Sequence, residues 1–164
     1  MLDRFRPPIV DWIAQREALV RGRYGVIEAR GGQVVAVHLR RWPTLAPWPE
    51  IWPVGPTYHA RGAVDRCLLH YNQPRRFPGF LALRYLVSTH ATSYRTVCAA
   101  LDALDDLAEL KGVDALLCDV ANSRLTDRMM ARHGWVSHKP QRRHRNFIKR
   151  FYGAYPGRAA RATC

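Results

Sequence analysis

The chain has 164 residues, 48% of them hydrophobic, which is enough to bury the core of one domain. No apolar run reaches the roughly 18 residues of a membrane-spanning helix, and the first residues lack the apolar stretch of a secretory signal, so we expect a cytoplasmic protein with no membrane partner. The formal charge of +13 favours an anionic partner, such as nucleic acid or a phosphorylated cofactor.

The basic residues and the cysteines limit this first interpretation. Only three of the 26 basic residues are lysine, and a genomic bias toward arginine would produce such a charge without any partner. The four cysteines form no C-x-x-C pair, which predicts reduced thiols that mostly pack in the core. No two histidines stand four residues apart with a carboxylate between them, so we expect no structural metal.

The N-terminal segment has the pattern of a helix. Pro8 suits an opening turn, and apolar residues recur from Ile9 to Val20 at three-, four- and seven-residue spacings. The pattern predicts a helix over about residues 8–21.

A hairpin and an irregular segment follow. Two β-rich runs, 24–30 and 33–39, flank Gly31 and Gly32, which is a strong hairpin signal. Residues 42–56 contain five prolines and three tryptophans, too many prolines for a helix and too many tryptophans for a solvated linker. We expect an ordered loop there, which either forms a wall of a substrate site or merely covers an edge of the core.

Two further segments precede the middle of the chain. Residues 63–71 fit a strand, although their spacing also allows a short helix. Residues 80–88 are apolar on both faces, as a central strand should be.

A helix and a second strand follow this central strand. Thr92 or Ser93 can cap a helix whose apolar residues recur at three- and four-residue spacings, and Gly112 ends it. Residues 113–120 read as the next strand, and a strand, helix, strand succession of this length implies a right-handed parallel crossover. The two strands should therefore lie side by side.

The last third of the chain repeats the alternation on a smaller scale. Asn122 or Ser123 is expected to cap a short helix that runs to His133 and stops at Gly134. A return strand over 135–138, a final strand over 146–152 and a basic flexible tail over 153–164 complete the prediction. Residues 1–152 would then form a single domain.

This succession of elements over residues 24–152 resembles the GNAT superfamily of N-acyltransferases. Its most specific part is the stretch 123–135, which is similar to the family's short helix followed by glycine and phenylalanine, here Gly134 and Trp135. The resemblance implies an α/β (α+β) fold with a GNAT-like mixed sheet, in which antiparallel N-terminal strands precede a β-α-β-α-β unit with one parallel strand pair. It also implies a divergent N-acyltransferase that moves an acyl group from acyl-CoA to an amine.

The resemblance places the cofactor, acetyl-CoA or another acyl-CoA, in a wedge where the two parallel strands separate. Its pyrophosphate would rest on backbone N–H groups that open the following helix, where unpaired donors and the helix dipole favour an anion in any case. The residues that would contact the cofactor are Leu86, Val87, Ser88, Ser93, Tyr94, Arg95, Thr96 and Asn122.

Two positions depart from the family pattern. The family loop R/Q-x-x-G-x-G/A corresponds to residues 88–100, which contain no glycine, and Cys98 takes one glycine position in the best register. The family's general-acid tyrosine corresponds to Met130, whose thioether cannot donate a proton. The sequence therefore leaves catalytic activity open. The side chains that could replace this acid are Tyr85, Cys118, His90 or His133. The carboxylates that could act as a general base are Glu28 and Asp65, although we expect each of them to be solvated.

A second hypothesis treats the fold as a non-catalytic scaffold that binds nucleic acid. Basic residues interleave with aromatic ones near the C-terminal end, and such a segment combines phosphate contacts with base stacking. The alternative is a basic edge strand that prevents pairing between sheets. The basic residues concerned are Arg142, Arg143, Arg145, Lys149 and Arg150.

Overall fold

The computed structural model describes residues 7–44, 65–89, 91–120, 125–139 and 145–157. Its helices are α1 (Arg16–Arg21), α4 (Tyr94–Lys111) and α5 (Asp127–Arg132). Its strands are β1 (Tyr24–Arg30), β2 (Gln33–Arg40), β3 (Arg66–Asn72), β4 (Phe80–Ser88), β5 (Ala115–Val120), β6 (Val136–Ser137) and β7 (Arg145–Arg150).

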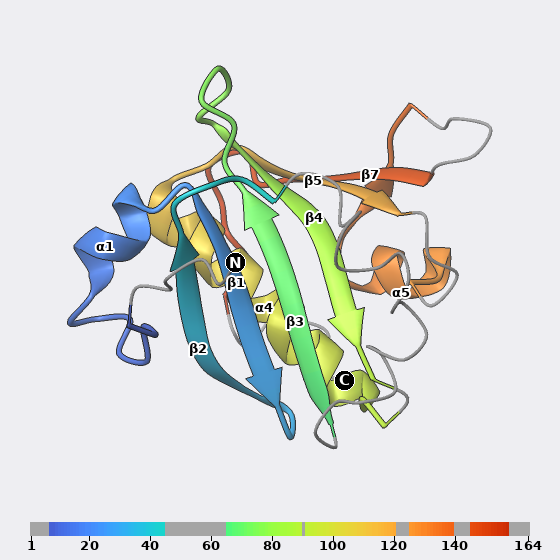
Figure 1. Cartoon of the computed structure of the whole chain (residues 1–164). Helices are drawn as coiled ribbons and strands as arrows, with labels where there is room; N and C mark the ends of the chain where they lie inside the picture. The colour runs from blue at the N-terminus through green and yellow to red at the C-terminus, as the bar shows by residue number, and fades with distance from the viewer. Residues whose placement is uncertain (1–6, 45–64, 90, 121–124, 140–144, 158–164) are drawn as a thin grey trace.

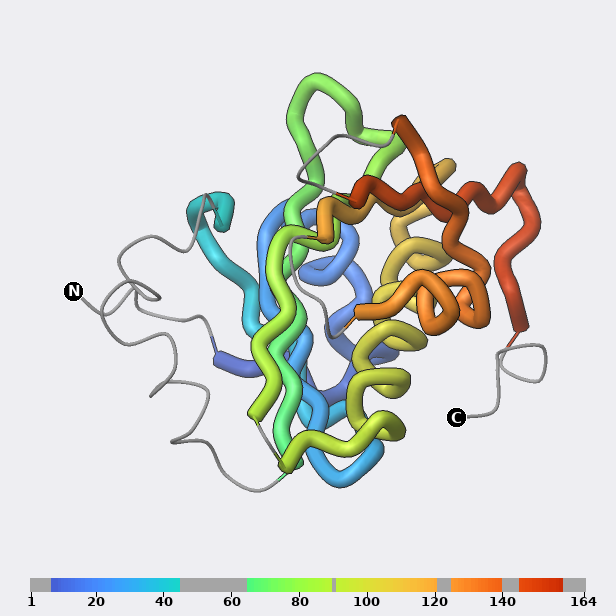
Figure 2. Tube along the Cα trace, turned by 90° about the vertical axis from the view of Figure 1, so that its right-hand side faces the viewer, coloured from blue at the N-terminus to red at the C-terminus, as the bar shows by residue number. Residues whose placement is uncertain are grey.

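The strands form one mixed sheet in the order β2-β1-β3-β4-β5-β7-β6 (Figure 1). All neighbouring strands are antiparallel except β4 and β5, which are parallel. Figure 2 shows α4 and α5 on the same side of the sheet, where their apolar residues and those of the strands enclose the core. The predicted fold class, antiparallel strands followed by a β-α-β-α-β unit with one parallel pair, is confirmed.

The predicted helix over residues 8–21 is mostly wrong, because only Arg16–Arg21 is helical. Ile9 pairs instead with Val37 on the outer strand β2, through two backbone hydrogen bonds of 2.8 Å. The Asp11 carboxylate then accepts the backbone N–H groups of Ile13 and Ala14, both at 2.9 Å. These local and long-range hydrogen bonds compete with the helix and delay its start.

The ambiguous segment before β4 is a strand. Arg66–Asn72 lies between β1 and β4 and is antiparallel to both, so its backbone groups are paired on each side. Three of its apolar side chains, Cys67, Leu69 and Tyr71, are fully buried. Of the loop predicted over 42–56, residues 45–56 lie outside the described residues.

Helix α4 is bounded as the sequence predicts. The Ser93 hydroxyl accepts the Thr96 N–H, and Gly112 ends the helix in the left-handed region, with φ of 63°. Lys111, in the last turn, donates to the backbone carbonyls of Val20 and Gly22, which ties α4 to the end of α1. None of the described helices is long and apolar enough to cross a membrane.

Helix α5 starts later than predicted. Its cap is Thr126, whose hydroxyl accepts the Met129 N–H at 3.2 Å, whereas Asn122 and Ser123 lie outside the described residues. Cap-type side chains occur at several positions before this short helix, and the local sequence does not rank them. The chain turns at Gly134, with φ of 79°, near the predicted stop.

Part of the segment expected to be a flexible tail is packed against the body of the protein. The Tyr155 hydroxyl donates to the Val113 carbonyl at 2.7 Å, and its ring lies 4.7 Å from that of Phe151. Residues 158–164 lie outside the described residues, and the assignment of 1–152 to a single domain stays a prediction.

Candidate functional site

The parallel strands β4 and β5 separate halfway along β4. Their ladder joins Phe80–Leu83 to Ala115–Cys118, while β4 continues to Ser88. The separation coincides with a bulge, because His70 of β3 pairs with Tyr85 and Tyr71 pairs with Leu83, so that Arg84 is left without a partner in that register. Beyond Leu83, β4 therefore presents to the β5 side a strand edge that no described strand pairs.

A cavity of about 390 Å³ lies beside this edge, on the side of the sheet that carries α4. Leu86 and Ser88 reach it from β4, and Tyr94 reaches it from the first turn of α4. Its other lining residues are Thr89, Thr92, Val97, Leu125 and Met129. The lining combines apolar side chains with small hydroxyl groups and contains no carboxylate.

A second cavity, of about 280 Å³, adjoins the first and shares Tyr94 and Met129 with it. Thr126, Arg128 and Arg132 complete its lining. The two arginines are exposed and stand four residues apart on α5. The pair of cavities thus offers an apolar and hydroxyl-lined part followed by a cationic part, an arrangement that suits a long ligand with an anionic end.

The N-terminus of α4 already holds an anion from the chain itself. The Asp65 carboxylate accepts the Ser93 backbone N–H at 2.7 Å and the Ser93 hydroxyl at 3.1 Å. Hydrogen bonds lower the pKa of Asp65 below its usual value, and the bond from the Ser93 backbone N–H has the largest effect. An external pyrophosphate at this helix end would meet a carboxylate, which opposes the contact inferred from the helix dipole alone.

The predicted cofactor-binding residues separate into two groups. Leu86, Ser88 and Tyr94 line the first cavity, whereas Val87 pairs with Leu68 and points to the other face of the sheet, between Leu86 and Ser88. The remaining predicted residues do not line the cavity. Ser93 caps α4, and the fully buried Thr96 hydroxyl accepts the Gly32 N–H. Arg95 lies against Gly32, and Asn122 is outside the described residues.

Sequence reasoning missed the contribution of α5. Arg128, Arg132 and Met129 fall within the stretch 123–135 that carries the family resemblance, but only Met130 and His133 were considered for chemistry there. The spacing of two arginines by four residues on one helix face was the available signal.

Neither candidate for catalysis lines the cavities. Tyr85 lies on the other face of the sheet beside His70, with 6.2 Å between the ring centroids. Cys118 is buried at the last position of β5 that pairs with β4, and burial raises the pKa of its thiol to about 12. Such a thiol keeps its proton near neutral pH and has the character of a packing residue.

Cys67 is also a buried free thiol, but Cys98 is disulfide-bonded, so the expectation of reduced cysteines is wrong there.

Glu28 is not the solvated residue that the sequence suggests. It is 5% exposed and forms ion pairs with Arg30 at 2.7 Å, His38 at 2.8 Å and Arg66 at 3.0 Å. Burial opposes its ionisation, but the hydrogen bonds from His38 and Arg30 and the charge of Arg66 outweigh burial and lower the pKa of Glu28. A carboxylate that accepts hydrogen bonds from two arginines and a histidine is a poor proton acceptor.

Two of the three described basic residues of the C-terminal segment form contacts within the protein. Lys149 forms a buried ion pair of 2.6 Å with Asp105, which removes it from the predicted nucleic-acid surface. Arg145 binds the Asp127 carboxylate at 2.7 Å and the Leu125 carbonyl at 2.9 Å. Arg150 is exposed, and Arg142 and Arg143 lie outside the described residues.

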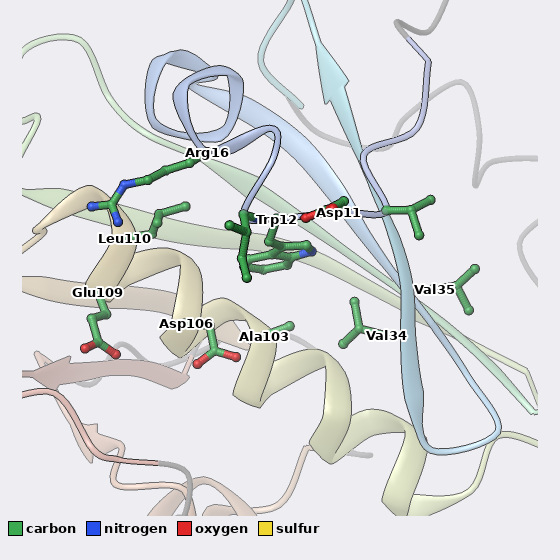
Figure 3. Close-up of a pocket in the computed structure, with 11 residues that line it drawn as sticks. Asp11, Trp12, Arg16, Val34, Val35, Ala103, Asp106, Glu109 and Leu110 are labelled. Atoms are coloured by element: carbon green, nitrogen blue, oxygen red, sulfur yellow. Dashed lines mark hydrogen bonds between the residues drawn. The ribbon is translucent and has the colours of Figure 1, made fainter.

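A larger cavity, of about 940 Å³, opens between the segment before α1, the start of β2 and the outer face of α4 (Figure 3). Asp106 and Glu109 of α4 border it together with Asp11, and Arg16 is the basic residue of its lining. This acidic rim disfavours the anionic ligand that the wedge fits. In the described part of the chain, no group of three or more His, Cys, Asp or Glu side chains is placed to hold a metal ion.

Comparisons with known proteins add little to this geometry. No protein-family model matches the chain, and no curated protein is significantly similar to it. A crystal structure assigned to the GNAT family of acetyltransferases, from Desulfovibrio desulfuricans, is similar with 14% identity and a TM-score of 0.44. That match covers 54% of this chain and 62% of the other, so this chain spans less than two thirds of the neighbour's length. So low a score leaves the family open.

Proposed function

We propose that the protein is a divergent N-acyltransferase that takes an acyl group from acyl-CoA and transfers it to an amine. The observation that carries the proposal is the separation of β4 from β5 beside a cavity lined by apolar and hydroxyl groups. An extended thioester arm with amide groups can hydrogen-bond to the unpaired edge of β4 while its apolar part contacts Leu86 and Val97.

The residues present fit an acyl-CoA ligand only if its phosphates lie away from the α4 N-terminus. Asp65 occupies that helix end. Arg128 and Arg132, which line the adjoining cavity, supply the positive charge instead, and guanidinium groups bind phosphate by two parallel hydrogen bonds. The cationic end of the site would therefore be α5.

The thioester supplies the activated acyl group, and the protein's own contribution is mainly to bind and orient it. Holding the acyl carbon beside the amine removes much of the entropic cost of the reaction, and strand N–H groups past Leu83 can polarise the carbonyl. Tyr94, which lines both cavities, is the residue of their linings that carries a phenol hydroxyl group.

Calorimetric titration with acetyl-CoA and with free CoA tests the proposal. The wild-type protein should bind both. Leu86→Trp should abolish binding by filling the first cavity, and Arg128→Ala/Arg132→Ala should weaken it by about a hundredfold, since each of the two lost charged hydrogen bonds costs roughly 1.5 kcal/mol. The double variant Arg16→Ala/Arg21→Ala removes two exposed arginines from α1 and serves as the matched control.

Absence of heat from the wild-type protein at millimolar acetyl-CoA contradicts the proposal. If the Arg128/Arg132 and Arg16/Arg21 double variants lose equal affinity for CoA, the binding is only non-specific attraction between an anion and a basic protein. Circular dichroism of Leu86→Trp distinguishes a filled cavity from a disrupted fold. A loss of turnover without a loss of CoA affinity in Tyr94→Phe would assign the Tyr94 hydroxyl to the chemical step.

A further inference from the structure

One end of the sheet carries a group of exposed arginine and aromatic side chains that the acyl-CoA site does not use. The group, here called the basic-aromatic end, consists of Trp42, Arg75, Arg76, Phe77, Arg150 and Tyr152. Its three aromatic residues are 62%, 61% and 85% exposed in the order Trp42, Phe77 and Tyr152. Exposure of that degree leaves part of each ring accessible to a ligand.

The strand register brings these separate segments to the same end. Arg40, just before Trp42, pairs with Tyr24 of β1, which pairs in turn with Asn72 at the end of β3. At the far side, Phe80 pairs with Ala115, and Ala115 pairs with Arg150. Figures 1 and 2 both show the β3–β4 loop and the chain after β7 at this end of the molecule.

The arginines of this end have no partner within the described part of the chain. Arg75, Arg76 and Arg150 are exposed and form no ion pair with any described residue. Arg41 adds a further exposed guanidinium, which lies over the Trp42 ring at 5.8 Å. Among the described residues, carboxylates near this end are Asp114, just before β5, and Glu109, near the end of α4. The end is therefore strongly cationic.

From these observations we propose that the basic-aromatic end binds single-stranded nucleic acid. Arginine groups contact the phosphates and the exposed rings stack on unpaired bases, which is how single strands are bound without sequence preference. The basic-aromatic end extends from β2 to β7 across five spacings between neighbouring strands, a length of about 24 Å at about 4.8 Å per spacing. That length suits a site of about four nucleotides, the lower limit for single-strand-binding domains.

The composition of the surface favours nucleic acid over an anionic membrane. A membrane-binding surface needs contiguous apolar side chains that enter the lipid. Here the aromatic residues alternate with arginines, and most exposed aliphatic residues lie elsewhere, with Val34 and Val35 at the opposite end of β2 and Ile13 before α1. Val20 is a single exposed aliphatic residue near this end, since Lys111 bonds both its carbonyl and the Gln73 side chain. The site shares only Arg150 with the basic residues suggested by sequence, of which Lys149 is buried in an ion pair.

Fluorescence anisotropy with labelled twelve-residue oligouridylate and oligodeoxythymidylate, at two salt concentrations, tests the inference. Arg75→Ala/Arg76→Ala should weaken binding and reduce the slope of log K against log salt by about 1.4, because each single-strand phosphate contact contributes about 0.7. Phe77→Leu should weaken binding about fivefold or more while it leaves that slope unchanged, since it removes stacking only. The control is Arg16→Ala/Arg21→Ala, which should bind as the wild-type protein does.

Each outcome decides the inference. Tight binding of either oligonucleotide with the pattern above supports it, and a preference between the two identifies RNA or DNA as the ligand. Absence of binding at low salt overturns it, as does an equal loss in the α1 control. A third overturning result is binding to phosphatidylserine vesicles that the Arg75/Arg76 and Phe77 variants weaken, with oligonucleotide binding unchanged. Acetyl-CoA titration of the same variants should match the wild-type protein, so failure here is distinguishable from failure of the acyltransferase proposal.

Discussion

The ammonium group of Lys149 and the carboxylate of Asp105 form an ion pair of 2.6 Å in which the side chains are 11% and 5% exposed. Lys149→Met should destabilise the fold by about 3 to 5 kcal/mol, because it leaves a buried carboxylate without its cation. Urea unfolding measures the change. The double variant Asp105→Asn/Lys149→Met should recover most of the loss, and a single variant within about 1 kcal/mol of wild type would show that water reaches the carboxylate.

His70 links stability to pH at the same scale. Burial, and then the charge of Arg40, lowers the pKa of His70 from 6.5 to about 4. Between these values the unfolded chain binds a proton that the folded protein does not, so stability is complete above pH 6.5 and falls as the pH drops toward 4. The loss is at most about 3 kcal/mol.

Denaturant unfolding at pH 7, 6 and 5 measures this dependence. His70→Gln should flatten it, apart from the part due to His133, whose pKa is also lowered, chiefly by burial. An unchanged slope in His70→Gln would place the effect on other groups. His138→Gln, at a partly exposed position, is the matched control.

At the scale of elements, the sequence predicted those helix and strand boundaries that depend on residues close together in the chain. Helix α4 has its cap and its stop within its own sequence, at Ser93 and Gly112; the stop was predicted, and the cap was predicted as Thr92 or Ser93. The first helix was predicted too long because Ile9 pairs with Val37, 28 positions later in the chain, and no periodicity reports such a contact. Strand β3 stayed ambiguous for the same reason, since its two neighbours settle it.

The cap of α4 gives a prediction at this scale. Ser93→Ala should cost about 1 kcal/mol through loss of the hydroxyl that accepts the Thr96 N–H, and Ser93→Asn should restore most of it. Aspartate is normally an equally good cap, but here it would stand beside the Asp65 carboxylate. Ser93→Asp should therefore be less stable than Ser93→Asn at neutral pH.

Thermal unfolding of the Ser93 series checks this electrostatic effect. The gap between Ser93→Asp and Ser93→Asn should narrow in 1 M salt, where the screening length falls to about 3 Å. It should also disappear in the Asp65→Asn background. Equal stability of the two variants at low salt would mean that Asp65 does not act as the anion of this helix end.

At the scale of the whole molecule, the family resemblance implied a cofactor wedge beside β4 but not the charges around it. Leu86, Ser88 and Tyr94, which the resemblance implied as cofactor contacts, line the first cavity, and their role in binding stays a prediction. Asp65 comes from before β3 and reaches α4 across 28 residues, so the closing of the helix end by a carboxylate had no local signal. The move of the cationic part to α5 follows from packing of α5 against α4, which spacing alone does not specify.

The two proposed sites lie at opposite ends of β4, and this separation predicts their independence. Phe80, at one end, borders the basic-aromatic end, and Ser88, at the other, lines the first cavity. Eight residue steps separate them, about 27 Å at about 3.4 Å per step, which exceeds the screening length of about 8 Å at physiological salt. Saturating acetyl-CoA should thus leave the oligonucleotide affinity unchanged within twofold, and by linkage the oligonucleotide should leave the acetyl-CoA affinity unchanged. Anisotropy titrations with and without acetyl-CoA measure the first effect. Mutual displacement would mean that both anions occupy one site, and the assignment of two separate sites would then be wrong.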